Sequence, residues 1–90
     1  DEAERRLTQA LAIFEKTLGP DHFNVGANLL FLGELYLQSG RLDDAEAAYR
    51  RSLDIWQTAG LNDSSNAATA RTGPDEVAAA RRGDTAAQGQ

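Results

Sequence analysis

Residues 29–52 read LLFLGELYLQSGRLDDAEAAYRRS, and this stretch decides the fold. Its first ten residues are mostly apolar, and they are followed by Gly40, the residue type that most often closes a helix. The remainder carries apolar side chains at helical spacing and begins with Asp43 and Glu46, which have the spacing of a capping box. The stretch therefore predicts two helices that are joined by a tight turn and lie antiparallel.

The sequence before this stretch predicts one more helix. Residues 2–18 place their apolar side chains on one helical stripe: Ala3, Leu7, Ala10, Leu11, Phe14 and Leu18. Gly19-Pro20 ends that helix, and Asp21 or Asn24 can cap the next one. We expect His22 to be a linker residue that bonds a backbone group at a helix end. The predicted helices are near residues 2–18, 23–39 and 43–58.

The sequence also repeats itself at a spacing of 42 residues. Residues 2–14 align with residues 44–56, with identities at Ala3/Ala45, Glu4/Glu46, Leu11/Leu53 and Ile13/Ile55. Repetition at such a period is typical of helical solenoids, in which each repeat buries its apolar face against a neighbour. The first and third predicted helices are therefore interpreted as the same element of two successive repeats.

The second and third predicted helices resemble the tetratricopeptide repeat (TPR). The resemblance is carried by Leu29-x-x-Leu32-Gly33-x-x-Tyr36, by Gly40, and by Ala45-x-x-x-Tyr49-x-x-Ser52. The 42-residue spacing and the linker Leu18-Gly19-Pro20-Asp21-His22 look like the kinesin-light-chain type of this repeat. The resemblance implies an all-α fold of antiparallel helix hairpins, stacked as an α-solenoid fragment of about one and a half repeats. Gly33 and Ala45 are then small because the two helices approach closely.

The C-terminal third of the chain has a different composition. Between residues 60 and 90 the large aliphatic side chains are Leu61 and Val77, and the other hydrophobic residues are alanines. Such a segment has little apolar surface to offset the entropy lost on ordering. We therefore divide the chain into a TPR-like region, 1–59, and a mostly unstructured tail or linker, 60–90, with a possible short helix over 75–82.

One stripe of the 23–39 helix is the candidate binding site. Phe31 and Leu35 are expected to meet the first helix. This leaves a stripe that the hairpin does not cover: Ala27, Leu30, Glu34 and Leu37. The alternative for this stripe is contact with a neighbouring repeat or with a second copy of the chain. By resemblance to TPR proteins, this stripe lines the concave face on which peptides bind. Because the stripe contains no Lys or Arg, we do not expect it to hold an acidic peptide terminus.

Composition removes several classes of function. The chain has a formal net charge of −5, no cysteine and one histidine, so we expect no nucleic-acid partner, no membrane partner, no metal site and no cofactor. We interpret Asp43, Asp44 and Glu46 as helix-start residues, not as calcium ligands or an acid–base pair. No catalytic set is recognisable, so an enzyme is not expected. The chain has no apolar run that spans a bilayer and no signal peptide, and we expect a cytoplasmic protein.

Two functions remain open. The first is a protein–protein interaction module that binds a peptide or a partner helix through the stripe on the 23–39 helix. The alternative is a structural role, as the self-associating end of a longer TPR solenoid that has no peptide ligand of its own. In this case the chain forms a homo-oligomer. Since the sequence begins at Asp1, we expect a piece of a longer protein. A third interpretation is that the tail leads to an effector domain outside this sequence.

Overall fold

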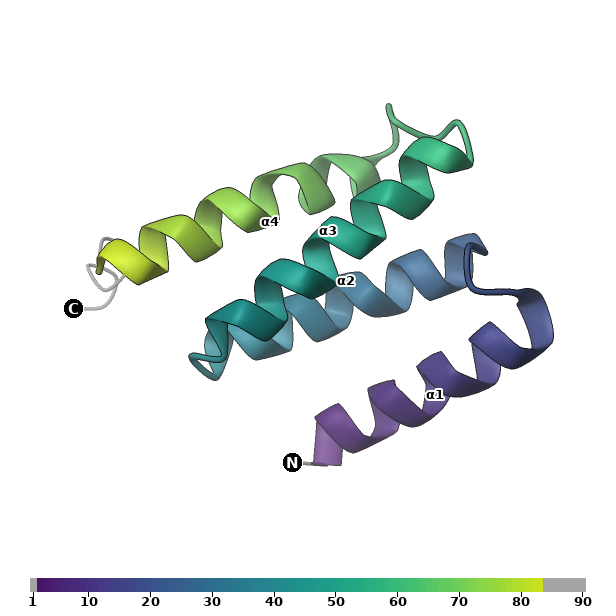
Figure 1. Cartoon of the computed structure of the whole chain (residues 1–90), viewed down its shortest axis with the longest axis horizontal. Helices are drawn as coiled ribbons and strands as arrows, with labels where there is room; N and C mark the ends of the chain where they lie inside the picture. Colours follow the sequence, from purple (N-terminus) through teal and green to yellow (C-terminus); the bar gives the residue numbers. More distant parts are fainter. Residues whose placement is uncertain (1, 84–90) are drawn as a thin grey trace.

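The computed structural model describes residues 2–83, which form four α-helices (Figure 1). The helices are α1 (Glu2–Leu18), α2 (Phe23–Gln38), α3 (Leu42–Thr58) and α4 (Ser65–Arg82). No β-strand occurs in this part of the chain. The prediction of an all-α fold of antiparallel helix hairpins is confirmed, and the first three helices begin and end within one residue of their predicted bounds.

Glycines and one histidine set the turns between the helices. Gly40 and Gly60 follow the ends of α2 and α3 with φ of +80° and +76°, a backbone region that disfavours residues with a Cβ atom. His22 is the N-cap of α2, and its Nδ1 accepts a hydrogen bond of 3.1 Å from the backbone N–H of Asn24. The structural role predicted for His22 is therefore confirmed, although His22 itself, not Asp21 or Asn24, supplies the cap.

α2 and α3 form the central hairpin. Gly33 of α2 faces the ring of Tyr49, and a Cβ atom at Gly33 would lie 3.0 Å from Cε1 of that ring. The Ser52 hydroxyl donates a 2.7 Å hydrogen bond to the carbonyl of Gly26 and accepts a 2.9 Å bond from Nε1 of Trp56. Small residues and one buried hydroxyl therefore let the two helices pack closely, as the sequence predicts for Gly33.

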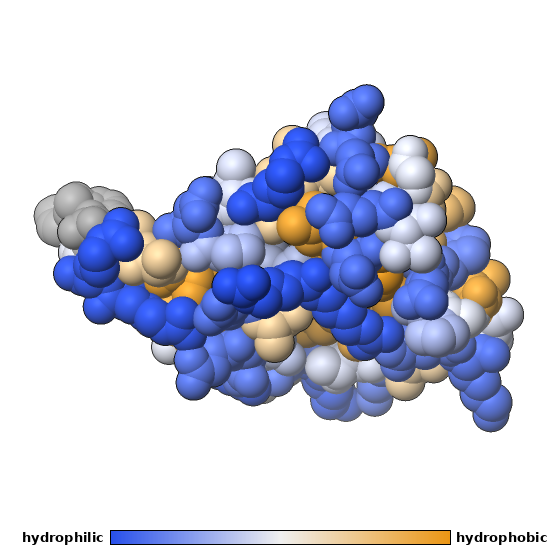
Figure 2. Space-filling model, turned by 45° about the horizontal axis from the view of Figure 1, so that its top comes forward, coloured by the Kyte–Doolittle hydropathy of each residue, from blue (hydrophilic) through white to orange (hydrophobic). Residues whose placement is uncertain are grey.

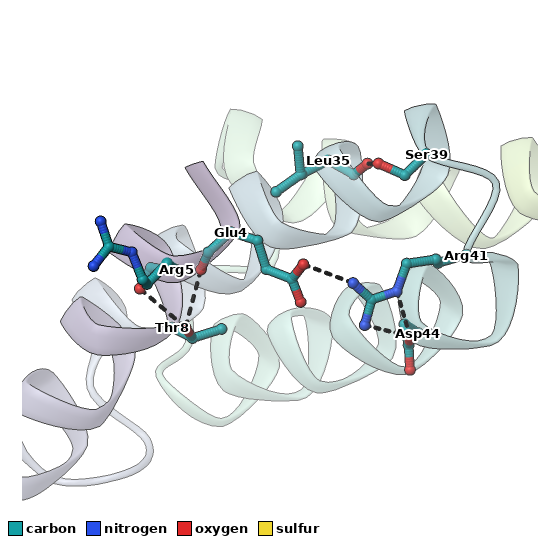
Figure 3. A network of polar contacts seen from close by, with 7 residues as sticks. All are labelled: Glu4, Arg5, Thr8, Leu35, Ser39, Arg41 and Asp44. Atoms are coloured by element: carbon teal, nitrogen blue, oxygen red, sulfur yellow. Dashed lines mark hydrogen bonds and ion pairs between the residues drawn. The ribbon is translucent and has the colours of Figure 1, made fainter. Parts of the chain in front are cut away.

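α1 packs on the other side of the hairpin. Its Leu11 and Phe14 lie against a buried cluster that α2 and α3 build together: Val25, Leu29, Ala48 and Ile55. Two ion pairs link α1 to the α3 region, one between Glu4 and Arg41 (2.7 Å) and one between Glu15 and Arg51 (2.5 Å). Figure 3 shows the first of these, where the Arg41 guanidinium also reaches Asp44 at 3.0 Å.

α4 corrects the prediction of a mostly unstructured tail. The described part of that tail forms an 18-residue helix, Ser65–Arg82, which packs on α3 and also touches α2. The short helix proposed for 75–82 is only its C-terminal half, and residues 84–90 of the predicted tail lie outside the described residues. Helix α4 begins 42 residues after α2, so it occupies the place of the first helix of a next repeat.

The buried face of α4 explains why a segment with few large apolar residues forms a packed helix. Ala67, Ala70, Gly73 and Val77 are buried, and they are small. The large side chains at this interface come instead from the hairpin, in a cluster that contains Leu30, Tyr49 and Trp56. Small residues on α4 let its backbone approach these side chains closely, and this packing holds a helix that contains Pro74, a residue without a backbone N–H to donate.

Candidate functional site

The structure places the four residues of the predicted stripe in different environments. Leu30 is 5% exposed and belongs to a buried cluster with Ala67, Ala70 and Val77 of α4. Ala27 and Leu37 are partly buried beside that cluster, whereas Glu34 is exposed. Of the two interpretations of the stripe, contact with a neighbouring helix therefore holds for Leu30, because α4 lies over it. The binding role of the stripe remains a prediction.

The solvent-facing side of α2 contains two aromatic residues that are not part of the predicted stripe. Phe23 is 52% exposed and Phe31 is 58% exposed. They lie four residues before and four residues after Ala27, so the three share one helical face, and Glu34 follows Phe31 by one turn. The expectation that α1 covers Phe31 is not met, since more than half of Phe31 is exposed and it belongs to neither buried cluster. We call the residues Phe23, Ala27, Phe31 and Glu34 the open face of α2.

Two carboxylates flank the buried phenol of Tyr49. Burial, and to a smaller extent the negative charges of Glu34 on α2 and Glu76 on α4, raise the pKa of Tyr49 to about 12. Both glutamates are exposed. The edge at which α2 and α4 come together therefore has negative potential.

The acidic residues at the start of α3 form ion pairs with arginines. Arg81 of α4 donates hydrogen bonds to Asp43 and, at 2.8 Å, to Glu46, and Arg50 also pairs with Glu46 at 2.7 Å. Arg81 and then Arg50 lower the pKa of Glu46. The predicted capping box is not formed, because Arg41 is the N-cap of α3 and makes no side-chain capping bond. Within residues 2–83 no group of acidic or histidine side chains could hold a metal ion.

The side of the molecule on which α3 and α4 lie is mostly hydrophilic. In Figure 2, hydrophilic side chains cover most of that side, and apolar atoms show only in separate patches between them. Among the four described helices, none combines the length and the apolar character needed to span a membrane.

The hairpin and the helix before it carry the signature of a known repeat. The family model described as Tetratricopeptide repeat matches residues 1–58, which is more than half of the chain. The chain belongs to the tetratricopeptide repeat family. No curated protein matches the chain. The matched residues comprise α1, α2 and α3, so the TPR signature ends where α3 ends.

The 42-residue spacing relates the four helices in pairs. Within the matched residues α2 is a first helix and α1 and α3 are second helices of successive repeats, and α4 begins 42 residues after α2, at the position of a next first helix. The equivalent residues Ile13 and Ile55 differ in how far neighbouring helices cover them. Ile55 is 2% exposed against α2, whereas Ile13, its equivalent on α1, is 59% exposed. The outer side of α1 therefore keeps an apolar residue in solvent at a place that is covered in the next repeat.

Proposed function

We propose that this TPR protein is an interaction module that binds a peptide or a partner helix through the open face of α2. TPR repeats generally mediate protein–protein interaction. The observation that supports this face is the exposure of Phe31, a large apolar side chain of which more than half is open to solvent. Full burial of a side chain of this size contributes about 1.5–3 kcal/mol, so covering the exposed part of Phe31 is one favourable contribution to a complex at this surface.

The residues of the predicted stripe have two roles in this proposal. Ala27 and Glu34 lie on the open face and contact the partner. Leu30 and Leu37 pack toward α4 and hold that helix beside α2. The finer assignment to the kinesin-light-chain type is part of the same proposal, and the 42-residue distance between the starts of α2 and α4 supports it.

A photo-crosslinking experiment tests the open face directly. A photoreactive phenylalanine analogue at position 31 should crosslink the partner, because this side chain faces solvent beside Ala27 and Glu34. The matched control is the same analogue at position 50, where Arg50 is exposed on α3. Equal crosslinking from positions 31 and 50 would contradict the proposal.

The exposure of Ile13 favours a second candidate function, the structural one. Here the outer side of α1 packs against another helix of a TPR solenoid, as Ile55 does against α2. The same analogue at position 13 separates the two functions. Crosslinks to a second copy of this chain from position 13, with none from position 31, would support a self-associating solenoid. Ile13→Asp should then abolish self-association in sedimentation.

A further inference from the structure

The packing around Tyr49 brings Glu34 of the open face and Glu76 of α4 close enough to act on the same phenol. Gly33 and Gly73 both lie against the Tyr49 ring, so α2 and α4 are held close to each other at this level. Glu34 directly follows Gly33, and Glu76 lies one turn after Gly73. Both side chains are exposed, and both act electrostatically on the same phenol.

These two carboxylates differ from most others in the described chain. Glu2, Glu4, Glu15, Asp43, Asp44 and Glu46 each form an ion pair with an arginine. Neither Glu34 nor Glu76 forms an ion pair or a hydrogen bond with another residue of the range 2–83. α2 carries no basic residue at all, so nothing on the open face itself can neutralise Glu34.

We propose that the partner of the open face is a protein segment that places a lysine or arginine beside large apolar side chains. This inference rests on the proposed function and adds the chemistry of the partner. Its apolar side chains cover Phe23 and Phe31, and its cation lies between Glu34 and Glu76. Charge complementarity selects this partner, since a segment with an acidic residue at the same place would meet two carboxylates and no cation.

A matched set of peptides tests the chemistry. The probes are two synthetic helical peptides with the same leucine pattern, one with lysine and one with glutamate at the flanking positions. The lysine peptide should bind the full chain on the order of tenfold more tightly, because two surface ion pairs together contribute about that much. Isothermal titration calorimetry at constant salt measures both affinities.

Two double variants with the same net charge serve as test and control. Glu34→Gln with Glu76→Gln should remove most of the preference for lysine. Asp54→Asn with Asp63→Asn changes the total charge equally at exposed positions outside the open face and should keep the preference. An equal loss of preference in the two double variants would overturn the inference, because it would show attraction to the net charge of −5 and not to this site.

The remaining outcomes separate the inference from the function on which it rests. If both peptides bind equally and Phe31→Ala weakens both, the open face binds partners but the inferred charge preference is wrong. If Phe31→Ala leaves the affinity of both peptides unchanged, the proposed function itself fails. A dimer that depends on Phe31 in sedimentation without peptide would make a second copy the occupant and would overturn the inference of a basic partner.

Discussion

The aromatic ring of Tyr49 lies between Gly33 of α2 and Gly73 of α4. A Cβ atom at Gly33 would be 3.0 Å from Cε1 of the ring, and one at Gly73 would be 2.3 Å from Cδ1 and from Cγ. Tyr49 is buried, so its ring has little room to move away. A single side chain of α3 therefore sets how closely two other helices approach it. The approach at Gly73 requires a residue without a Cβ atom, whereas a Cβ at Gly33 would only be a tight contact.

We expect Gly73→Ala to destabilise the protein. The alanine Cβ would overlap the ring of Tyr49, so α4 must shift away, at a cost of about 1–3 kcal/mol that exceeds the gain of up to about 1 kcal/mol in helix propensity. Urea unfolding followed by circular dichroism measures the change. Thr72→Ala, at the exposed neighbouring position, is the control and should stay within about 0.5 kcal/mol of the parent. A Gly73→Ala variant as stable as the parent would contradict the packing described here.

Removal of α4 should destabilise the helices that remain. A chain that ends at residue 62 exposes Leu30, Tyr49 and Trp56, which α4 helps to cover. Loss of the buried Val77 alone removes about 1.5–3 kcal/mol, so the total exceeds about 2 kcal/mol. Trp56 is the one tryptophan of the sequence, so its fluorescence reports the removal of α4. We expect its emission to shift to the red and the melting temperature followed by this signal to fall. An unchanged melting temperature would restore the interpretation of residues 62–83 as a tail that does not pack.

Much of the fold could be predicted from sequence because two signals agreed. Helical periodicity specifies α1, α2 and α3, the 42-residue repeat makes α1 and α3 the same element, and the turn at Gly40 follows the end of α2 as predicted. α4 was missed because its stability depends on large side chains that another helix supplies. Composition counts the apolar residues of a segment, but not those of the surface on which it packs. Gly73 looks like a helix breaker in the sequence and is a contact residue in the fold.

The candidate site was predicted less well, because the exposed face of α2 lies at a different position around the helix axis from the predicted stripe. The predicted stripe assumes that α2 has one uncovered side centred on Leu30. Helix α4 covers that side, and the open face lies farther round the helix, at Phe23, Ala27 and Phe31. The spacing of four residues between these three positions is present in the sequence. It could not be read as an exposed face until α1 and α4 were placed around α2.

The hydroxyl of Ser52 should stabilise the hairpin. Ser52→Ala removes the hydrogen bond to the Gly26 carbonyl and leaves Nε1 of the buried Trp56 without this acceptor. We expect a loss of about 1–3 kcal/mol, because buried polar groups are costly to leave unpaired. A double-mutant cycle with Trp56→Phe, analysed by urea unfolding, isolates the second effect. The cost of Ser52→Ala should be smaller in the Trp56→Phe background, and equal costs in both backgrounds would show that the pair is not coupled.

The ion pairs of Glu46 should make the stability gained from Arg81 depend on pH. Arg81 and Arg50 lower the pKa of Glu46 from its ordinary value of 4.5. A carboxyl group with a lowered pKa stabilises the folded state above its ordinary pKa, and this contribution is lost as the pH falls through the lowered value. Arg81→Gln should therefore be less stable than the parent at neutral pH, and the difference should shrink below about pH 4.

A comparison of urea unfolding at neutral and acidic pH measures this difference. Arg71→Gln is the matched control, because Arg71 lies on the same helix and donates to the carbonyl of Asn62, not to a carboxylate. Its effect on stability should not change with the protonation of Glu46. High salt should also reduce the effect of Arg81→Gln, since exposed ion pairs are screened. An effect of Arg81→Gln that is the same at both pH values would contradict the role given to this ion pair.

Leu30 and Phe31 are neighbours in sequence, and they should respond in opposite ways to substitution. Leu30 is buried beneath α4, so Leu30→Ala should cost about 2–5 kcal/mol of stability through the cavity that it leaves. Phe31 faces solvent, so Phe31→Ala should change the free energy of unfolding by less than about 0.5 kcal/mol. For partner binding we expect the opposite order, with the larger effect from Phe31→Ala. A folded Phe31→Ala variant should lose affinity for a partner of the open face, because the partner loses the apolar surface that it covers.

Unfolding and partner binding are therefore measured on both variants. Leu37→Ala, at a partly buried position on the side of α2 toward α4, gives an intermediate reference for stability. If Leu30→Ala unfolds with the same free energy as the parent, α4 does not cover α2 in solution, and the stripe of Ala27, Leu30, Glu34 and Leu37 becomes the available surface again. If Phe31→Ala is the destabilised variant, Phe31 belongs to a packed interface. In that case the open face is buried in the native assembly, which favours the solenoid function over the peptide-binding one.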